Sequence, residues 1–268
     1  MHKLVFVQIQ ALLLITLLLV LGNGVAEDQS ESTDSEGQQL FHESVHILGG
    51  RGAPVVRWNR PVHVAIVGAA DESLQAYIRS IFNQISLLSG IRYRLVQHNF
   101  ETAGDYALAL SDSPDYELSV CDTVEKSLCA NFVVILSDRS SMHQVAAKLP
   151  MRPVYQRATA KDDGDLLCFF SPGIYRRLEI VSSIVYVDSD STESMQRICL
   201  QEEIYQSFGL FGDYSNSEFF SFNNKVQEKH VTVYDKILLS SLYDDAFEPG
   251  TMASKIATQV VVYCEIDC

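Results

Sequence analysis

A strand followed directly by an amphipathic helix constrains this chain more than any other local pattern. The segment 61–67 alternates and is rich in β-branched residues, which predicts a β-strand. Asp71 or Ser73 then caps a segment in which apolar residues recur at helical spacing, and Gly90 ends that segment. The apolar residues are Leu74, Tyr77, Ile78, Ile81, Ile85 and Leu88.

Shorter strand signals follow, and helical signals return toward the C-terminus. Strands are predicted over residues 91–96, 106–110, 131–136, 166–170 and 180–187. Helices are predicted from Ser191 or Thr192 to Phe208 with Gly209 as the stop, from Thr232 through Leu242, and over 254–263. The order of these elements predicts one α+β domain, beginning near Leu40 and covering 40–268.

The N-terminus has the pattern of a secretory signal peptide. Lys3 precedes the nearly apolar stretch 4–21, and Gly24-Val25-Ala26 supplies the small residues that a signal peptidase reads. An uncleaved membrane anchor is the alternative, because the stretch approaches the ~20 residues that span a bilayer. We predict a signal peptide at residues 1–26, cleaved near Ala26, and no membrane span after cleavage.

Acidic residues dominate the charge of the chain. Residues 27–39 hold five acidic residues, no basic residue and no apolar residue, which predicts a disordered acidic leader. The whole chain has a formal net charge of −14. A general nucleic-acid binder has a basic surface instead, so the charge argues against a nucleic-acid partner.

Six cysteines form an even set, and in an exported protein such a set indicates disulfides. Sequence separation favours the pairs Cys121–Cys129 and Cys264–Cys268 as local loops, which leaves Cys168–Cys199. Other pairings stay open, since spacing alone does not choose among them. A zinc cluster is disfavoured because the chain has no C-x2-C pairs at finger or ribbon spacing.

The segment 42–46 matches the metalloprotease motif H-E-x-x-H letter for letter. That motif requires a helix, which places two imidazoles one turn apart on a metal ion. Here the segment follows the acidic leader, and Gly49-Gly50 comes directly after it. Residues 41–47 alternate as in a short strand, which would hold His42 and His46 farther apart. We therefore interpret this match as coincidental.

A second segment, 202–213, lies on a predicted helix after a predicted strand. It follows in part the metzincin pattern H-E-x-x-H-x-x-G-x-x-H-D, in which a helix and a following loop carry three metal ligands. Glu203 stands at the general-base position, Gly209 at the turn and Asp213 at the end. The three ligand histidines are replaced by Glu202, Gln206 and Gly212.

Further groups of residues surround this segment. They are Ser221-Phe222-Asn223-Asn224, then Thr232-x-x-Asp235-x-x-x-Leu239-x-x-Leu242-Tyr243-Asp244, and Pro249-Gly250-x-Met252. Together with Glu202-Glu203-x-x-Gln206-x-x-Gly209-Leu210-x-x-Asp213, they resemble an uncharacterised domain-of-unknown-function family of exported bacterial proteins. The resemblance covers roughly residues 180–255, and the segment Arg57–Val62 suits the N-terminal part of the family. It implies a zincin-like (metzincin-like) domain with a mixed sheet, an active-site-type helix and C-terminal helices, but no activity.

The degenerate motif offers oxygen and amide ligands in place of imidazoles. Glu202 and Gln206 are four residues apart, so they lie on one face of a helix. Such ligands favour a weakly held hard cation such as Ca2+ or Mg2+, and zinc is not expected. In the structural alternative, Leu200, Ile204 and Phe208 face a core, and the polar side chains bond nearby backbone.

We predict a non-catalytic binding or structural role at the bacterial envelope, in the periplasm or outside the cell, with a peptide or protein as partner. Glu202, Gln206 and Asp213 are the candidate binding residues. The alternative is a metal-dependent peptidase or hydrolase with Glu203 as general base, and a secreted effector acting on a host is a third class. His63, His98, His143, His230 and Met252 are weaker candidates. The chain has no G-x-S-x-G, P-loop or Rossmann glycine pattern.

Overall fold

The computed structural model describes residues 31–96, 130–146, 167–175, 178–214, 217–221 and 231–267. The chain forms two units, residues 1–40 and 41–268, and the second holds the sheet and the motif. Several predictions lie outside the described residues: the signal peptide, the strand at 106–110, His98, His230, Cys121, Cys129 and Cys268. Among the described residues, no helix is long and apolar enough to cross a membrane.

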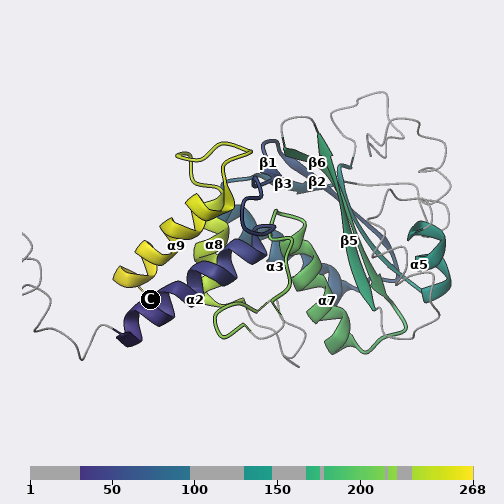
Figure 1. Ribbon diagram of the computed structural model, residues 1–268. Coiled ribbons are helices and arrows are strands. Elements are labelled where there is room, and N and C mark those ends of the chain that lie inside the picture. The colour runs from purple at the N-terminus through teal and green to yellow at the C-terminus, as the bar shows by residue number, and fades with distance from the viewer. Residues whose placement is uncertain are drawn as a thin grey trace, which may run out of the picture. The chain divides into compact units, whose positions relative to one another are not determined.

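A six-stranded mixed sheet forms the centre of the second unit (Figure 1). The strands are β1 (Arg57–Trp58), β2 (Val62–Gly68), β3 (Tyr93–Leu95), β4 (Phe132–Ser137), β5 (Cys168–Tyr175) and β6 (Glu179–Asp188). Along the order β1-β6-β4-β2-β3, every neighbouring pair is parallel. Strand β5 pairs with β6 in the antiparallel direction. The predicted mixed sheet is therefore confirmed. Because most of its strand pairs are parallel, the architecture is mixed α/β, whereas the order of the elements predicted an α+β domain.

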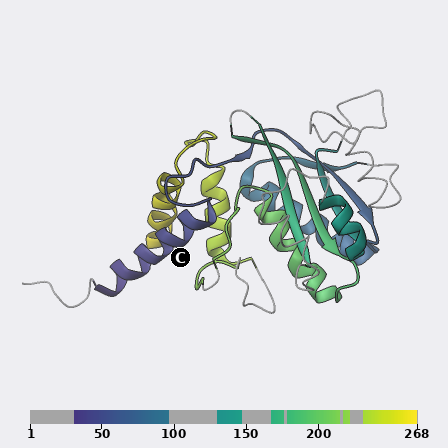
Figure 2. The ribbon, with the colours of Figure 1, turned by 45° about the vertical axis from the view of Figure 1, so that its right-hand side comes forward.

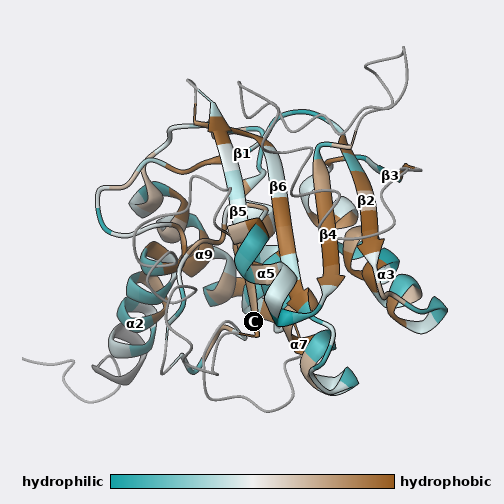
Figure 3. Cartoon of the chain, turned by 90° about the vertical axis from the view of Figure 1, so that its right-hand side faces the viewer, coloured by the Kyte–Doolittle hydropathy of each residue, from teal (hydrophilic) through white to brown (hydrophobic). Residues whose placement is uncertain are grey.

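The central strands are apolar on both faces, as the strands of a covered parallel sheet are. In β4, all five residues from Phe132 to Leu136 are buried. Figure 3 shows the hydrophobic colour along β2 and β4 and along the second half of β6. Apolar side chains on both faces require helices on both faces, and the described helices meet this requirement.

The described residues form six helices. They are α2 (Glu31–Ile47), α3 (Glu72–Ser89), α5 (Arg139–Ala146), α7 (Glu193–Gln206), α8 (Val233–Leu242) and α9 (Ala253–Asp267). Helices α3 and α7 pack against each other (Figure 2), and the Phe82 ring of α3 contacts the rings of Phe132 and Phe208. Helix α5 covers the other face, where Met142 and Val145 pack with Ile135 and Tyr186.

The predicted N-terminal caps of α3, α7 and α8 and the predicted stop of α3 agree with the structure. The Asp71 side chain accepts a hydrogen bond from the Leu74 amide at 2.8 Å at the start of α3, and Gly90 ends that helix with a φ of 71°. Thr192 and Thr232 cap α7 and α8 through their hydroxyl groups. These caps succeed as predictions because they depend on local hydrogen bonds.

Helix α2 corrects two predictions. Residues 31–39 of the predicted disordered leader are helical, and so is the predicted strand at 41–47. The alternation within 41–47 was misleading, because Phe41, Val45 and Leu48 also follow the helical spacing of four and three residues, and Val45 and Leu48 are buried. Burial of this stripe favours the helix.

Helix α5 and the second half of β5 were not predicted. The eight-residue α5 begins where the Asp138 carboxylate accepts a hydrogen bond from the Ser141 amide at 2.9 Å. Strand β5 continues through Pro172 and Gly173 to Tyr175. Proline is tolerated there because β5 is an edge strand within the described sheet.

Candidate functional site

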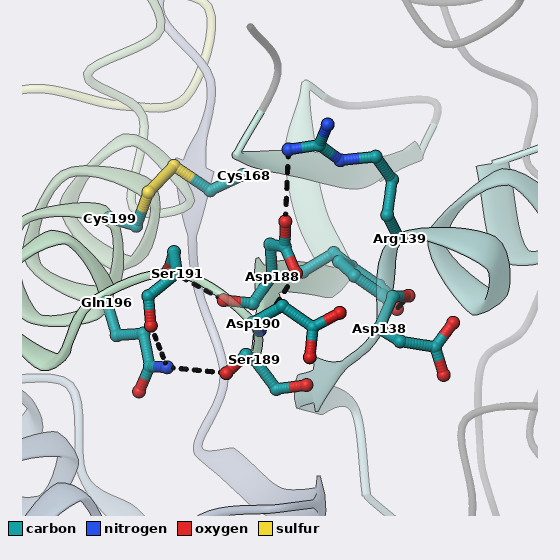
Figure 4. A network of polar contacts seen from close by, with 10 residues as sticks. Asp138, Arg139, Cys168, Asp188, Ser189, Asp190, Ser191, Gln196 and Cys199 are labelled. Carbon is teal, nitrogen blue, oxygen red and sulfur yellow. Dashed lines mark hydrogen bonds and ion pairs between the residues drawn. A yellow bond between two sulfur atoms is a disulfide. The ribbon is translucent and has the colours of Figure 1, made fainter. Parts of the chain in front are cut away.

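The motif helix α7 is positioned by the turn that joins it to β6. Figure 4 shows this turn. The Asp188 carboxylate accepts a hydrogen bond from the Asp190 amide at 3.0 Å and lies 3.2 Å from the Arg139 guanidinium. The Gln196 amide group donates to the carbonyls of Ser189 and Ser191 at 2.9 Å each. These bonds couple the carboxyl end of β6 to the first turns of α7.

Gly209 turns the chain away from α7 in a conformation that only glycine adopts readily. Its φ is 106°, and a Cβ atom there would lie 2.4 Å from the Val56 carbonyl oxygen. Helix α7 itself ends at Gln206, and one further turn leads to Gly209. The predicted role of Gly209 as the stop after the helix is therefore confirmed.

Two of the predicted binding residues, one before and one after Gly209, are in contact. The Gln206 amide group of α7 donates a hydrogen bond to the Asp213 carboxylate. Gln206 is buried, whereas Asp213 is exposed. Glu203, the candidate general base, is buried on α7, and Glu202 is half-buried beside it. The motif thus forms a compact polar group at the end of α7.

The C-terminal turn of α2 joins this group, although the sequence suggested no connection. The His46 Nε2 atom donates a hydrogen bond to the Asp213 carbonyl oxygen at 3.0 Å. The His46 ring also meets the Tyr214 ring edge to face, with 5.4 Å between the ring centroids. Glu43 is fully buried, and its carboxylate accepts a hydrogen bond from the Ser217 hydroxyl at 2.5 Å. The H-E-x-x-H match is therefore helical and part of the site.

Gly212, at the third histidine position of the metzincin pattern, packs directly on α2. Its amide donates a hydrogen bond to the Ile47 carbonyl oxygen at 2.9 Å. A Cβ atom at Gly212 would lie 2.4 Å from the His46 carbonyl oxygen and 3.0 Å from the Ile47 Cα atom. Both obstacles are backbone, so no side chain fits at position 212 while α2 holds this place.

The segment 217–221 continues the site toward α8. Its Ser221 amide donates to both carboxylate oxygens of Asp235, at 3.2 and 3.3 Å. Asp235 also accepts from the Thr232 amide at 2.7 Å, as part of the capping box of α8. Burial raises the pKa of the Asp235 carboxyl, and these hydrogen bonds oppose that shift. Two buried carboxylates, Glu43 and Asp235, thus hold this short segment.

The two histidines of α2 do not combine with other ligands into a metal site. The Arg51 guanidinium donates a hydrogen bond to the His42 Nδ1 atom at 3.3 Å, and His46 is engaged with Asp213. Within the described ranges, no group of three or more His, Cys, Asp or Glu side chains is arranged to hold a metal ion. Gln206 and Asp213 supply amide and oxygen groups, which do not suit tight zinc binding, and the His46 Nε2 atom beside them is used in the hydrogen bond to the Asp213 carbonyl oxygen.

The predicted pair of cysteines is bonded in the structure. Cys168 of β5 and Cys199 of α7 form a disulfide, which links the edge strand to the motif helix (Figure 4). Cys264 is also disulfide-bonded.

Comparison with known proteins gives the family. Residues 38–261 match the family DUF2927, described as a protein of unknown function. The chain belongs to the DUF2927 family. Comparison with curated proteins and with solved structures finds no match. The resemblance to a family of unknown function is therefore confirmed over a range wider than the predicted one.

The remaining candidate residues of this DUF2927 protein lie elsewhere. Met252 is exposed and forms an isolated β-bridge with Pro54. His63 lies on β2 and is half-buried, and His143 lies on α5. The contribution of α2 could have been found from the helical spacing of Phe41, Val45 and Leu48.

Proposed function

We propose that this DUF2927 protein is an exported, zincin-like protein of the bacterial envelope, in the periplasm or outside the cell, with a binding or structural role and without catalytic zinc. The observation that carries the proposal is the packing of Gly212 on α2. A Cβ atom at Gly212, the third ligand position of the metzincin pattern, would lie 2.4 Å from the His46 carbonyl oxygen, so a histidine has no room there. The site is built to hold the C-terminal turn of α2 together with residues 212–214 and Ser217.

The other replaced ligand positions support the same role. The Gln206 amide group donates a hydrogen bond to the Asp213 carboxylate, and the backbone carbonyl of Asp213 accepts a hydrogen bond from His46. Polar groups that bond one another across three segments stabilise those segments and are satisfied without a metal ion. We therefore assign Glu202, Gln206 and Asp213 to binding or support, with no cofactor beyond a weakly held hard cation.

The zincin-like description rests on the placement of the motif. Helix α7 follows directly from a strand of a mixed sheet and leads into a turn at a glycine with positive φ, as the metzincin-like motif requires. Export is supported by the apolar N-terminal stretch and is consistent with the disulfide between Cys168 and Cys199. The partner we propose is a peptide or protein, since the acidic chain does not suit nucleic acid.

A comparison of two neighbouring carboxylates tests the proposal. Wild type, Glu203→Gln and Glu202→Gln are each incubated with a broad peptide library, with and without a chelator, and each is melted thermally. We expect no chelator-sensitive cleavage by any of them. Glu203→Gln should fold and lose roughly 1.5–3 kcal/mol of stability if its buried carboxylate accepts a charge-assisted hydrogen bond.

The hydrolase alternative gives a different pattern. Loss of a general base typically slows catalysis by about 10²–10⁴-fold. Cleavage by wild type and by Glu202→Gln that is lost in Glu203→Gln, with unchanged melting of Glu203→Gln, would replace the non-catalytic proposal with a hydrolase.

A further inference from the structure

Strand β5 is a weak edge strand by sequence. Within the described residues it pairs with β6 and with no other strand. It contains Pro172 and Gly173, both unfavourable in strands, and its register shifts between Gly173 and Ile174. Ile174 and Tyr175 are 45% and 56% exposed. Pro172 and Gly173 therefore weaken the middle of β5, although the aromatic and β-branched residues at its two ends favour a strand.

Contacts at the first half of β5 compensate for this weakness. The Phe169 ring stacks on the Tyr186 ring of β6 at 5.5 Å between centroids. The Phe170 ring stacks on the Phe211 ring at 5.9 Å, next to the segment that packs on α2. Cys168, the first residue of β5, is bonded covalently to Cys199 of α7. The strand is thus attached at one end to the motif helix.

We propose that the Cys168–Cys199 disulfide is a redox-sensitive tether that keeps β5 on β6 and thereby covers Phe211 beside the candidate site. In the oxidised protein the bond joins the edge strand to α7. In the reduced protein β5 separates locally from β6, the backbone N–H and C=O groups along that edge of β6 become accessible, and Phe211 loses its stacking partner. This inference is independent of the function proposed above, because it concerns the sheet edge and not the chemistry of the motif.

The chemistry requires a dithiol reductant. One thiolate of the reductant attacks the Sγ atom of Cys168, which is half-buried, whereas Cys199 is 2% exposed. A mixed disulfide forms at Cys168, and the Cys199 sulfur leaves as a thiolate. The second thiol of the reductant then closes a disulfide with the first and releases Cys168. Two electrons pass to the protein, and the two protons of the dithiol end on Cys168 and Cys199.

Hydrogen exchange of the full oxidised chain, measured by mass spectrometry, tests the tether. The double variant Cys168→Ala/Cys199→Ala removes this disulfide and leaves the other cysteines in place. We expect amide exchange in 168–175 and 180–187 to accelerate at least about tenfold, with β2 and β4 unchanged, as in local opening of one sheet edge. Val64→Ala, which truncates a buried residue of β2, gives the contrasting pattern of a general loss of stability.

A titration with dithiothreitol repeats the test on wild type, so the result does not depend on folding of the variant. Support requires that exchange in 168–175 rises together with reduction of the Cys168–Cys199 bond and before exchange in β2 rises. The double variant should show no further change in 168–175 on reduction. The proposal is wrong if β5 and β2 accelerate together, or if β5 exchange is unchanged after this bond is reduced.

Discussion

The backbone at Gly212 lies directly against the carbonyl group of His46, where a Cβ atom would come within 2.4 Å of the carbonyl oxygen. A position that aligns with a metal ligand in the metzincin pattern is thus a close contact between two backbone segments. The contact joins the loop after α7 to the end of α2.

Replacing Gly212 with alanine should destabilise the protein by steric overlap. Overpacking against backbone costs roughly 1–3 kcal/mol, because neither the His46 carbonyl nor the Ile47 Cα atom can rotate away. Gly52→Ala is the control: nothing lies within 4 Å of its Cβ position, and its φ of 84° penalises alanine by strain alone. Urea denaturation of both variants gives the comparison. A Gly212→Ala protein as stable as wild type would show that α2 does not occupy this place.

Glu43 and Ser217 should be energetically coupled. Their side chains are separated by 174 residues in sequence and hydrogen-bonded at 2.5 Å, and Glu43 is fully buried. A hydrogen bond to a charged group contributes about 1.5–3 kcal/mol, so we expect a coupling energy of that order from Glu43→Gln, Ser217→Ala and the double variant. Glu36→Gln, an exposed change earlier in α2, is the matched control. Strictly additive effects would contradict the contact.

Asp235 should make stability fall as pH rises. Burial raises its pKa in the folded protein, so the folded state binds a proton more tightly than the unfolded state does. Its stabilising contribution is complete below the unfolded-state pKa of about 3.9 and is lost as pH rises through the higher folded-state pKa. Urea denaturation at a series of pH values should show this loss in wild type. Asp235→Asn, which does not titrate, should lack that component, and parallel pH curves would refute the assignment.

Purified protein should carry far less than one zinc ion per chain. The residues at the three ligand positions are Glu202, Gln206 and Gly212, which provide no imidazole. Elemental analysis of protein prepared without chelator measures the zinc content directly. Stoichiometric zinc that disappears in Glu202→Ala or Gln206→Ala would overturn the expectation.

Local patterns were sufficient for much of the fold. The α3 helix between Asp71 and Gly90, the caps at Thr192 and Thr232 and the turn at Gly209 each depend on a few neighbouring residues. The Cys168–Cys199 pair was predicted because the other four cysteines lie close enough in sequence to form two local pairs, which leaves these two. Strand β4 was equally visible, because a continuous apolar run suits a strand covered on both faces.

Local patterns failed where two spacings competed. Residues 41–47 alternate in polarity and also place apolar residues at helical intervals, so periodicity alone allows either element. Burial of Val45, Ile47 and Leu48 selects the helix. The short α5 was not predicted because its local pattern is weak. Its Met142 and Val145 are buried by contacts with the sheet, which local spacing does not reveal.

The sequence by itself determined the central strands β2, β4 and β6, the caps of α3, α7 and α8, and the residues on the motif helix. Hydrogen bonds and side-chain spacing within a few residues control these features. Only the tertiary structure decided that His46 reaches Asp213, 167 residues away, and that Gly212 packs on the end of α2. Such contacts depend on where the folded sheet and helices place distant segments. The periodicity of the sequence carries no information about that placement, so these contacts of the site could be identified only from the tertiary structure.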